Sequence, residues 1–334
     1  MVLSINGYNG AGKSVLKGIL DGHPDIFVSP THDNSLGMFT RIEDSEEQWM
    51  KFKDIEKLRE KMACYGRYFR LERFSYNKKI PFGFSSGETI YIPFELDWSY
   101  FDSRVIDRLN MLDNWNPEII VSSIYEQLDQ SLNSNDIQRK YYGGMDEPDL
   151  PYLENFFRNY PHGKMLHVER DIYSVTATLS NRKTIKDDFR SLLLKNYSVK
   201  EFIQTGRLKH LLNYLATIKK IKELHPNQIL SVSFENLVLK TKSELKKICE
   251  FLNVQQHPAL DNWSCLGKEV TNNGVKYIGD ILDDPKVLLS NEEYHLINKE
   301  IENFGKDKQR NMSPLSRYKA HITKIKKGVF GIIR

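Results

Sequence analysis

The sequence opens on a glycine-rich segment whose residue types and spacing could bind a phosphate group. Gly7 is followed, after four residues, by Gly12-Lys13-Ser14, which is the spacing of a nucleotide phosphate loop. Glycines let backbone N–H groups approach a phosphate closely, the lysine adds a positive charge, and the serine hydroxyl can bind an anionic oxygen or Mg²⁺. The sequence therefore predicts a phosphate-binding loop, with a chance glycine-rich turn as the alternative.

The residues on either side of this loop predict the strand and the helix that must hold it. A short apolar run, Val2 to Ile5, precedes the loop, and apolar residues recur at helical spacing between Val15 and Leu20. His23-Pro24 blocks continuation of that helix, and residues 26–28 open a second strand. Strand, loop and helix in this order are typical of a parallel sheet covered by helices.

Three further apolar runs, residues 118–122, 164–168 and 228–233, look like buried strands, each followed by a helix-like segment. We therefore expect an α/β fold of the phosphate-loop type, with a central parallel sheet flanked by helices. Residues 41–115 show no such pattern: they begin with a charged amphipathic segment and continue with an aromatic, basic stretch. They predict an inserted, mainly helical cap that recognises an acceptor, within a single domain of residues 1–310.

Composition and charge narrow the class of protein. Hydrophobic residues make up 40% and charged residues 28% of the 334 residues, which indicates a folded globular chain. The 48 Lys and Arg against 44 Asp and Glu leave a net charge of +4, too small to predict a nucleic-acid partner. The three cysteines are widely spaced and show no zinc-ligand spacing, so we expect reduced thiols and no metal. No signal-peptide pattern and no run of about 18 apolar residues occurs, which predicts a cytoplasmic protein without a membrane span.

The loop by itself leaves the phosphorylated donor open. A kinase that uses ATP and Mg²⁺ would also show an apolar strand ending in an aspartate for the magnesium shell. The run at 118–122 ends in serine, and the run from residue 164 passes through Glu169 and Arg170 before Asp171. Neither is a clean match, so ATP is a weaker but open alternative.

The first helix and its loop resemble the 5′-phosphosulfate segment of the sulfotransferase family, which reads like S-G-T-T-L-L-x-x-L-L-D-x-H-P. Ile19-Leu20-Asp21 and His23-Pro24 fit this pattern in register, and Ala11-Gly12-Lys13-Ser14 then occupies the S-G-T-T positions. Residues 163–182 look like the family's 3′-phosphate segment, with Arg170 at its arginine and Thr178, eight residues on, at its hydroxyl. An arginine fork and a hydroxyl can clamp a dianionic phosphate. Without this resemblance, Arg170 and Asp171 would be interpreted as a surface ion pair.

Two weaker stretches agree with the resemblance. The segment that begins at residue 229 is similar to the family's Y-E-D-L-V pattern, with Phe234-Glu235-Asn236-Leu237 at its start. Apolar residues on one face of its helix indicate that most of it packs in the core. Residues 265–274 look like the family's late G-K loop, which suggests Lys268 as a further phosphate contact.

The resemblance implies 3′-phosphoadenosine-5′-phosphosulfate as donor and transfer of a sulfuryl group, without a metal, to a hydroxyl or amine. We expect the acceptor to be a hydroxyl of a glycan, a lipid-linked saccharide or a small metabolite. Lys13 would then stabilise the leaving 5′-phosphate, while Ser14 and the amides from Gly10 to Ser14 hold its other oxygens. The chain departs from the family at Gly10, where many members carry Lys or Arg, and at Asp146-Glu147-Pro148, where members commonly show Lys-Thr-Pro. A P-loop kinase and a non-catalytic nucleotide-binding protein therefore stay open as alternatives.

Two features have both a functional and a structural interpretation. His32 and Asp33, after the second predicted strand, could accept the acceptor's proton, or they could form a turn that caps a helix. The C-terminal tail, residues 311–334, concentrates Lys and Arg among apolar residues. It could pack on the domain as a solvated helix, or it could bring the protein to an anionic membrane as a peripheral contact.

Overall fold

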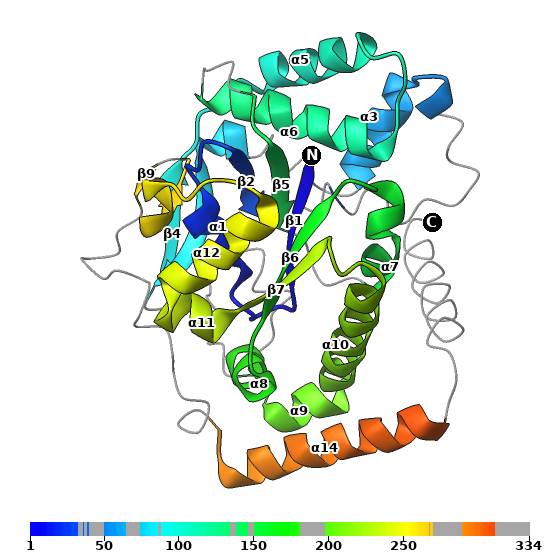
Figure 1. Cartoon of the computed structure of the whole chain (residues 1–334), viewed down its shortest axis with the longest axis vertical. Coiled ribbons are helices and arrows are strands. Elements are labelled where there is room, and N and C mark those ends of the chain that lie inside the picture. The colour runs from blue at the N-terminus through cyan, green and yellow to red at the C-terminus, as the bar shows by residue number, and fades with distance from the viewer. Residues whose placement is uncertain are drawn as a thin grey trace.

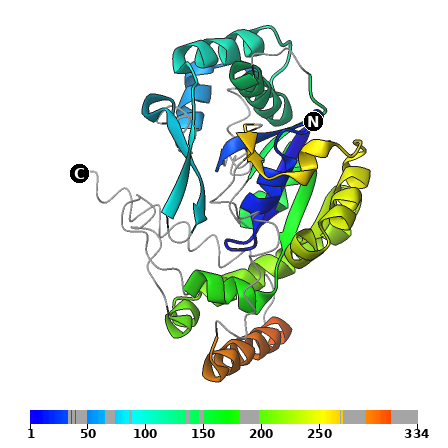
Figure 2. The same ribbon diagram turned by 90° about the vertical axis from the view of Figure 1, so that its left-hand side faces the viewer.

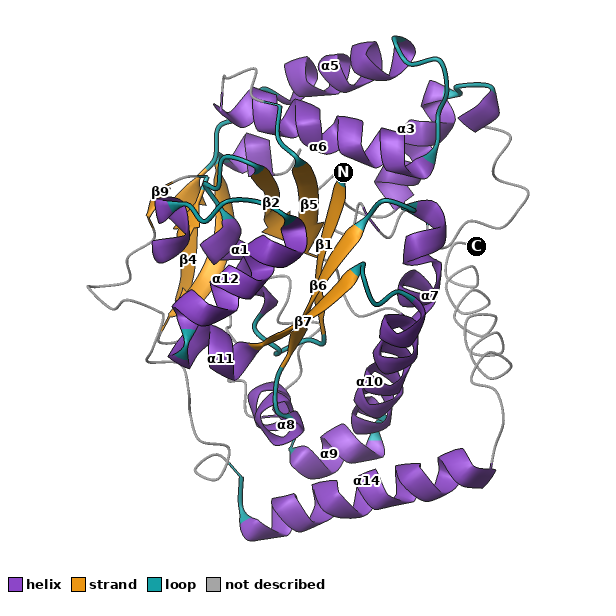
Figure 3. Cartoon of the chain, in the orientation of Figure 1, coloured by secondary structure: helices purple, strands orange, loops and turns teal. Residues whose placement is uncertain are grey.

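The computed structural model describes residues 1–32, 36, 39, 50–64, 74–85, 88–133, 138–145, 150–180, 198–266, 268–269 and 289–310. At its centre lies a parallel sheet of five strands in the order β2-β5-β1-β6-β7. Helices flank this sheet, as Figures 1 and 3 show. The expected α/β fold is confirmed.

The strands of the central sheet are β1 (Val2–Gly7), β2 (Ile26–His32), β5 (Tyr141–Met145), β6 (Lys164–Glu169) and β7 (Ile229–Ser233). The helices are α1 (Lys13–Leu20), α3 (Ile55–Cys64), α5 (Trp98–Asn110), α6 (Pro117–Asn133), α7 (Leu150–Asn159), α8 (Ile172–Ser180), α9 (Val199–Gln204), α10 (Arg207–Leu224), α11 (Phe234–Leu239), α12 (Thr241–Leu252) and α14 (Asn291–Arg310). Two antiparallel hairpins, β3 (Lys79–Ser85) with β4 (Glu88–Pro93) and β8 (Ser264–Cys265) with β9 (Lys268–Glu269), and a 3₁₀ turn at Pro258–Asp261 complete the described elements. The predicted order of strand, loop, helix and strand at the N-terminus is confirmed, as are the strands at 164–168 and 228–233.

The register of the sheet determines which loops meet. In the parallel pair of β1 and β6, Asn6 lies opposite His167 and Gly7 opposite Val168. In the pair of β6 and β7, Glu169 lies opposite Ser233. Because parallel strands end at the same edge of a sheet, the segments that follow β1, β6 and β7 lie side by side there.

The strand predicted at residues 118–122 is wrong, since this segment lies in helix α6. Pro117 is the first residue of α6, where a missing N–H costs nothing, and the Asn116 side chain accepts a hydrogen bond of 2.9 Å from the Ile119 amide. These start signals outweigh the strand preference of the run of β-branched residues.

The sequence pattern missed strand β5, which lies between β1 and β2 in the central sheet. Its sequence, Tyr-Tyr-Gly-Gly-Met, carries two glycines, which weaken a strand prediction. A Cβ atom at Gly143 would lie 1.8 Å from the carbonyl oxygen of Leu3 on the neighbouring strand β1. The glycine is thus required by the close approach of two backbones.

The segment predicted as a helical cap, residues 41–115, contains helices α3 and α5 but also the antiparallel hairpin of β3 and β4. Figure 2 shows this hairpin extending from the helices of the same segment alongside the central sheet. The aromatic and basic stretch near residue 79 is thus partly strand, with Lys79 Nζ 4.5 Å from the ring centroid of Tyr91. Residues 41–49, at the start of the predicted amphipathic segment, lie outside the described residues.

The described residues were searched for a membrane-spanning helix and for a metal site. None of the helices in the described ranges is both long and apolar enough to cross a membrane. In the same part of the chain, no group of three or more His, Cys, Asp or Glu side chains is placed to hold a metal ion. The C-terminal tail, residues 311–334, lies outside the described residues.

Candidate nucleotide site

The glycine-rich loop joins the end of β1 to the start of α1. The amide of Ala11 donates to the carbonyl of Tyr8 at 3.0 Å, which closes the turn, and Gly12 begins α1 with a φ of 98°. A Cβ atom at Gly12 would lie 2.2 Å from Cδ2 of Phe234, so the position has neither the dihedral angle nor the space for a side chain. The first N–H groups of a helix have no acceptor within the helix, and the helix dipole favours an anion at that end.

The ammonium group of Lys13 is held inside this loop. Lys13 is only 6% exposed, and its Nζ donates a hydrogen bond of 2.7 Å to the carbonyl oxygen of Gly7, the first residue of the loop. This hydrogen bond keeps the positive charge next to the loop backbone, where a phosphate oxygen can replace the carbonyl as its partner.

Arg170, directly after β6, reaches the same loop. Its Nη1 donates to the carbonyl oxygen of Gly10 at 3.0 Å and to Oγ1 of Thr178, on helix α8, at 3.3 Å. The structure therefore brings Arg170, Thr178 and the glycine loop together, although Gly10 and Arg170 are 160 residues apart in the sequence. Two groups that suit phosphate recognition, the loop and the guanidinium, thus lie at one edge of the sheet.

Comparison with known protein families identifies the family of this chain. The family model described as "Sulfotransferase family" matches residues 5–258, which is most of the chain. The chain belongs to the sulfotransferase family.

Solved structures of sulfotransferases resemble the chain distantly. The sulfotransferase domain from the curacin biosynthetic pathway shares 15% identity at a TM-score of 0.45, over 90% of this chain and 97% of that one. The sulfotransferase domain of the Synechococcus PCC 7002 olefin synthase shares 15% identity at 0.41, over 90% and 94%. A sulfotransferase from Alicyclobacillus acidocaldarius shares 13% identity at 0.40, over 90% and 91%. The comparison with curated proteins finds no match.

One of the two predicted proton acceptors, His32, is the last residue of β2. His32 is opposite Met145 in the sheet, and the Ser14 hydroxyl is 3.8 Å from Sδ of Met145. The backbone of His32 therefore reaches the edge where the loop lies. The His32 side chain and all of Asp33 lie outside the described residues, so their role as base stays a prediction.

Lys268 also stays a prediction. Its backbone pairs with Cys265 in the small hairpin of β8 and β9, and its side chain lies outside the described residues. Next to it in the hairpin, Ser264 donates to the carboxylate of Asp21 at 2.6 Å, at the carboxyl end of α1. The hairpin is thus fastened to the end of α1 that points away from the loop.

A buried polar group behind the loop was missed by the sequence analysis. The hydroxyl of Tyr214, on α10, makes a short hydrogen bond to Oδ1 of Asn6 and lies 3.1 Å from Nδ1 of His167. Burial, together with the positive charges of Lys13 and Lys222, lowers the pKa of His167 to about 3, so its imidazole is neutral. The available signal was a polar residue, Asn6, near the end of the mainly apolar strand β1.

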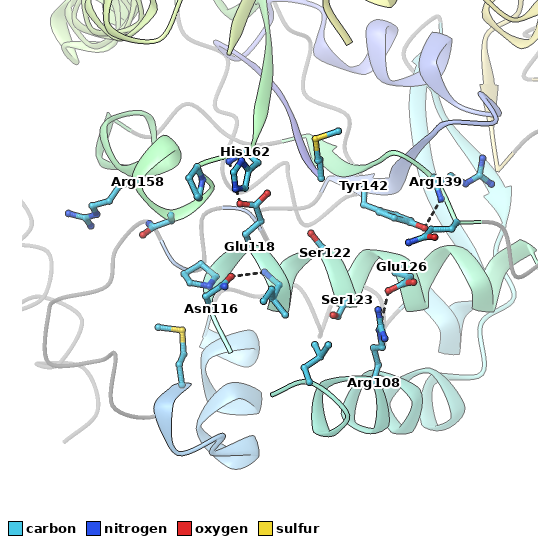
Figure 4. Close-up of a pocket in the computed structure, with 18 residues that line it drawn as sticks. Arg108, Asn116, Glu118, Ser122, Ser123, Glu126, Arg139, Tyr142, Arg158 and His162 are labelled. Atoms are coloured by element: carbon cyan, nitrogen blue, oxygen red, sulfur yellow. Dashed lines mark hydrogen bonds and ion pairs between the residues drawn. The ribbon is translucent and has the colours of Figure 1, made fainter. Parts of the chain in front are cut away.

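A separate cleft of about 930 Å³ opens at the amino ends of the strands, away from the loop. Figure 4 shows Glu118 and Glu126 on α6 along one side of it, with Tyr142 and Arg139 on the other. Arg108, also in its wall, is paired with Glu126 at 3.2 Å. Among the predicted site residues whose side chains the structure describes, none lines this cleft.

Proposed function

We propose that this sulfotransferase uses 3′-phosphoadenosine-5′-phosphosulfate as its donor. The observation that carries the proposal is the hydrogen bond between Arg170 and the carbonyl of Gly10. A nucleotide with phosphates at both its 5′ and 3′ positions needs two separate anion partners, and the loop and the guanidinium supply one each. A nucleoside triphosphate carries its phosphates in one chain and needs only the loop.

In the proposed reaction, an acceptor oxygen attacks the sulfur of the donor in line with the bond that breaks. A new S–O bond forms to the acceptor, and the S–O bond to the 5′-phosphate breaks with its electron pair on the phosphate oxygen. Lys13 and the backbone amides of the loop stabilise that developing negative charge. The products are a sulfate ester and adenosine 3′,5′-bisphosphate.

The acceptor hydroxyl must lose a proton, and we propose His32 or Asp33 as its base. The backbone of His32 supports this, since it lies opposite Met145, which contacts Ser14 of the loop. An imidazole has an ordinary pKa near 6.5, so it can accept a proton near neutral pH. The acceptor class that we propose is a hydroxyl of a glycan, a lipid-linked saccharide or a small metabolite.

Thermal unfolding with two nucleotides tests the donor. A ligand that binds only the folded state raises the unfolding midpoint in proportion to the logarithm of its concentration over Kd. We expect adenosine 3′,5′-bisphosphate to raise the midpoint in the presence of EDTA, and to raise it much less in the Arg170→Ala variant. Stabilisation by ATP with Mg²⁺, and none by the bisphosphate, would instead indicate a kinase.

We also propose that the protein works in the cytoplasm and that its basic tail, residues 311–334, contacts anionic lipid. The tail concentrates Lys and Arg among Ile, Val and Phe, which suits a membrane surface. Sedimentation with vesicles of phosphatidylserine and phosphatidylcholine, compared with vesicles of phosphatidylcholine alone, tests this. Equal binding of the full chain and a chain ending at residue 310 would reject the tail as the contact.

A further inference from the structure

One aromatic ring touches both parts of the nucleotide site. Phe234, the first residue of α11, is 1% exposed and packs against the loop so closely that a Cβ atom at Gly12 would lie within 2.2 Å of it. Its ring also faces Arg170, whose Cζ lies 4.6 Å from the ring centroid. The ring therefore packs against both the glycine loop, at Gly12, and the guanidinium of Arg170.

The corner that carries this ring is itself fixed by hydrogen bonds. The hydroxyl of Ser233 accepts from the amide of Asn236 at 3.2 Å, which caps α11. The next carboxylate, Glu235, accepts at 3.2 Å from the amide of Asp171, the residue that follows Arg170. The turn after β7 is thus tied to the turn after β6, so the ring and the arginine are held on two linked turns.

These contacts give the ring two physical effects on the arginine. A guanidinium over an aromatic face is attracted by the ring's quadrupole, more strongly where water is excluded. The ring also fills the space into which the guanidinium would otherwise turn, so the hydrogen bonds to Gly10 and Thr178 are kept at 3.0 and 3.3 Å. A cation kept at a fixed distance from the loop selects ligands whose two phosphates match that distance.

We propose that Phe234 is a positioning residue that fixes the guanidinium of Arg170 relative to the glycine loop, and thereby sets the preference for a nucleotide with both 3′- and 5′-phosphates. The inference rests on the proposed function, because it concerns how the donor is selected. It assigns a role in the site to a segment that the sequence pattern attributes mainly to core packing.

Calorimetric titration with adenosine 3′,5′-bisphosphate and with adenosine 5′-monophosphate provides the first test. In Phe234→Leu we expect bisphosphate affinity to fall by about tenfold and monophosphate affinity by less than about twofold. Phe234→Tyr, which keeps the ring, should bind both nucleotides as the native chain does. Phe101→Leu is the matched control, because Phe101 is fully buried on α5, in the inserted segment, and loses the same ring.

Unfolding without ligand provides a second test that does not depend on the donor. If the ring holds the guanidinium, the losses of stability in Phe234→Leu and Arg170→Met should be non-additive in the double variant. Additive losses, or an equal fall in affinity for both nucleotides in Phe234→Leu, would overturn the proposal. A native chain that binds neither nucleotide would refute the proposed function. The additivity of the unfolding free energies would then decide by itself whether Phe234 positions Arg170.

Discussion

Arg170, directly after β6, donates a hydrogen bond of 3.0 Å to the carbonyl oxygen of Gly10, in the loop that follows the neighbouring parallel strand β1. The contact requires β1 and β6 to be neighbours in the sheet, which they are, with Gly7 opposite Val168. It fixes the arginine beside the loop before any nucleotide binds, so little ordering of this side chain is needed on binding.

Replacing Arg170 should weaken binding of the 3′-phosphate. In Arg170→Ala we expect the Kd for adenosine 3′,5′-bisphosphate to rise by about 10- to 100-fold, the range for losing charge-assisted hydrogen bonds. The Kd for adenosine 5′-monophosphate should change much less. Calorimetry measures both, with Arg108→Ala as control, since Arg108 pairs with Glu126 in the separate cleft. An unchanged Kd for the bisphosphate would remove Arg170 from the nucleotide site.

Replacing Lys13 should lower kcat strongly and change the stability of the fold much less. In Lys13→Ala we expect kcat to fall by about a thousandfold, because a charge at the leaving group acts mainly in the transition state. Lys17 is the matched control: it is also buried on α1, and its Nζ donates to the Pro30 carbonyl at 2.6 Å. Lys17→Ala should lower the unfolding midpoint and leave kcat within a few fold of the native value. If both variants lose turnover equally, the charge of Lys13 has no special role.

Alanine substitutions at Gly12 and Gly206 distinguish the cost of backbone strain from the cost of a steric clash. Both have positive φ, 98° and 76°, but an added Cβ meets Phe234 at 2.2 Å in the first case and nothing within 4 Å in the second. Gly206→Ala should cost about 1 kcal/mol of stability. Gly12→Ala should cost at least about 3 kcal/mol and weaken nucleotide binding, because the ring must move. Chemical denaturation compares the two, and equal losses would show that the ring yields freely.

His167 should make stability depend on pH. Burial and the nearby charges lower its native pKa to about 3 from the ordinary 6.5, so below pH 6.5 the unfolded chain gains a proton that the folded chain does not. Stability is therefore lost as the pH falls from 6.5 toward 3, by about 2 kcal/mol between pH 7 and pH 5. Denaturation of the native chain and of His167→Gln at both pH values measures this loss of stability. The variant has no imidazole at position 167 and should not show it. Parallel pH profiles of the two proteins would contradict the assigned pKa.

Local sequence patterns predicted the secondary structure correctly where residues close together in the chain determine it. Gly7 to Ser14, with an apolar run before and helical spacing after, predicted the loop, its strand and its helix correctly. At residues 118–122 the local pattern failed, since an apolar run in a helix and one in a strand look alike and Asn116-Pro117 decided the outcome. At Gly143 it failed because the need for glycine comes from Leu3 on another strand.

The sequence by itself determined the glycine-rich loop between a strand and a helix, the parallel α/β class and, through motifs in order, the resemblance to sulfotransferases. Only the tertiary structure decided that Arg170 bonds to Gly10 and that the ring of Phe234 packs against both Gly12 and Arg170. It also decided that Tyr214 joins Asn6 to His167. These contacts depend on the order of strands in the sheet and on which helix covers each of them. Such an order is set by packing among segments far apart in the chain, so the periodicity within one segment cannot predict it.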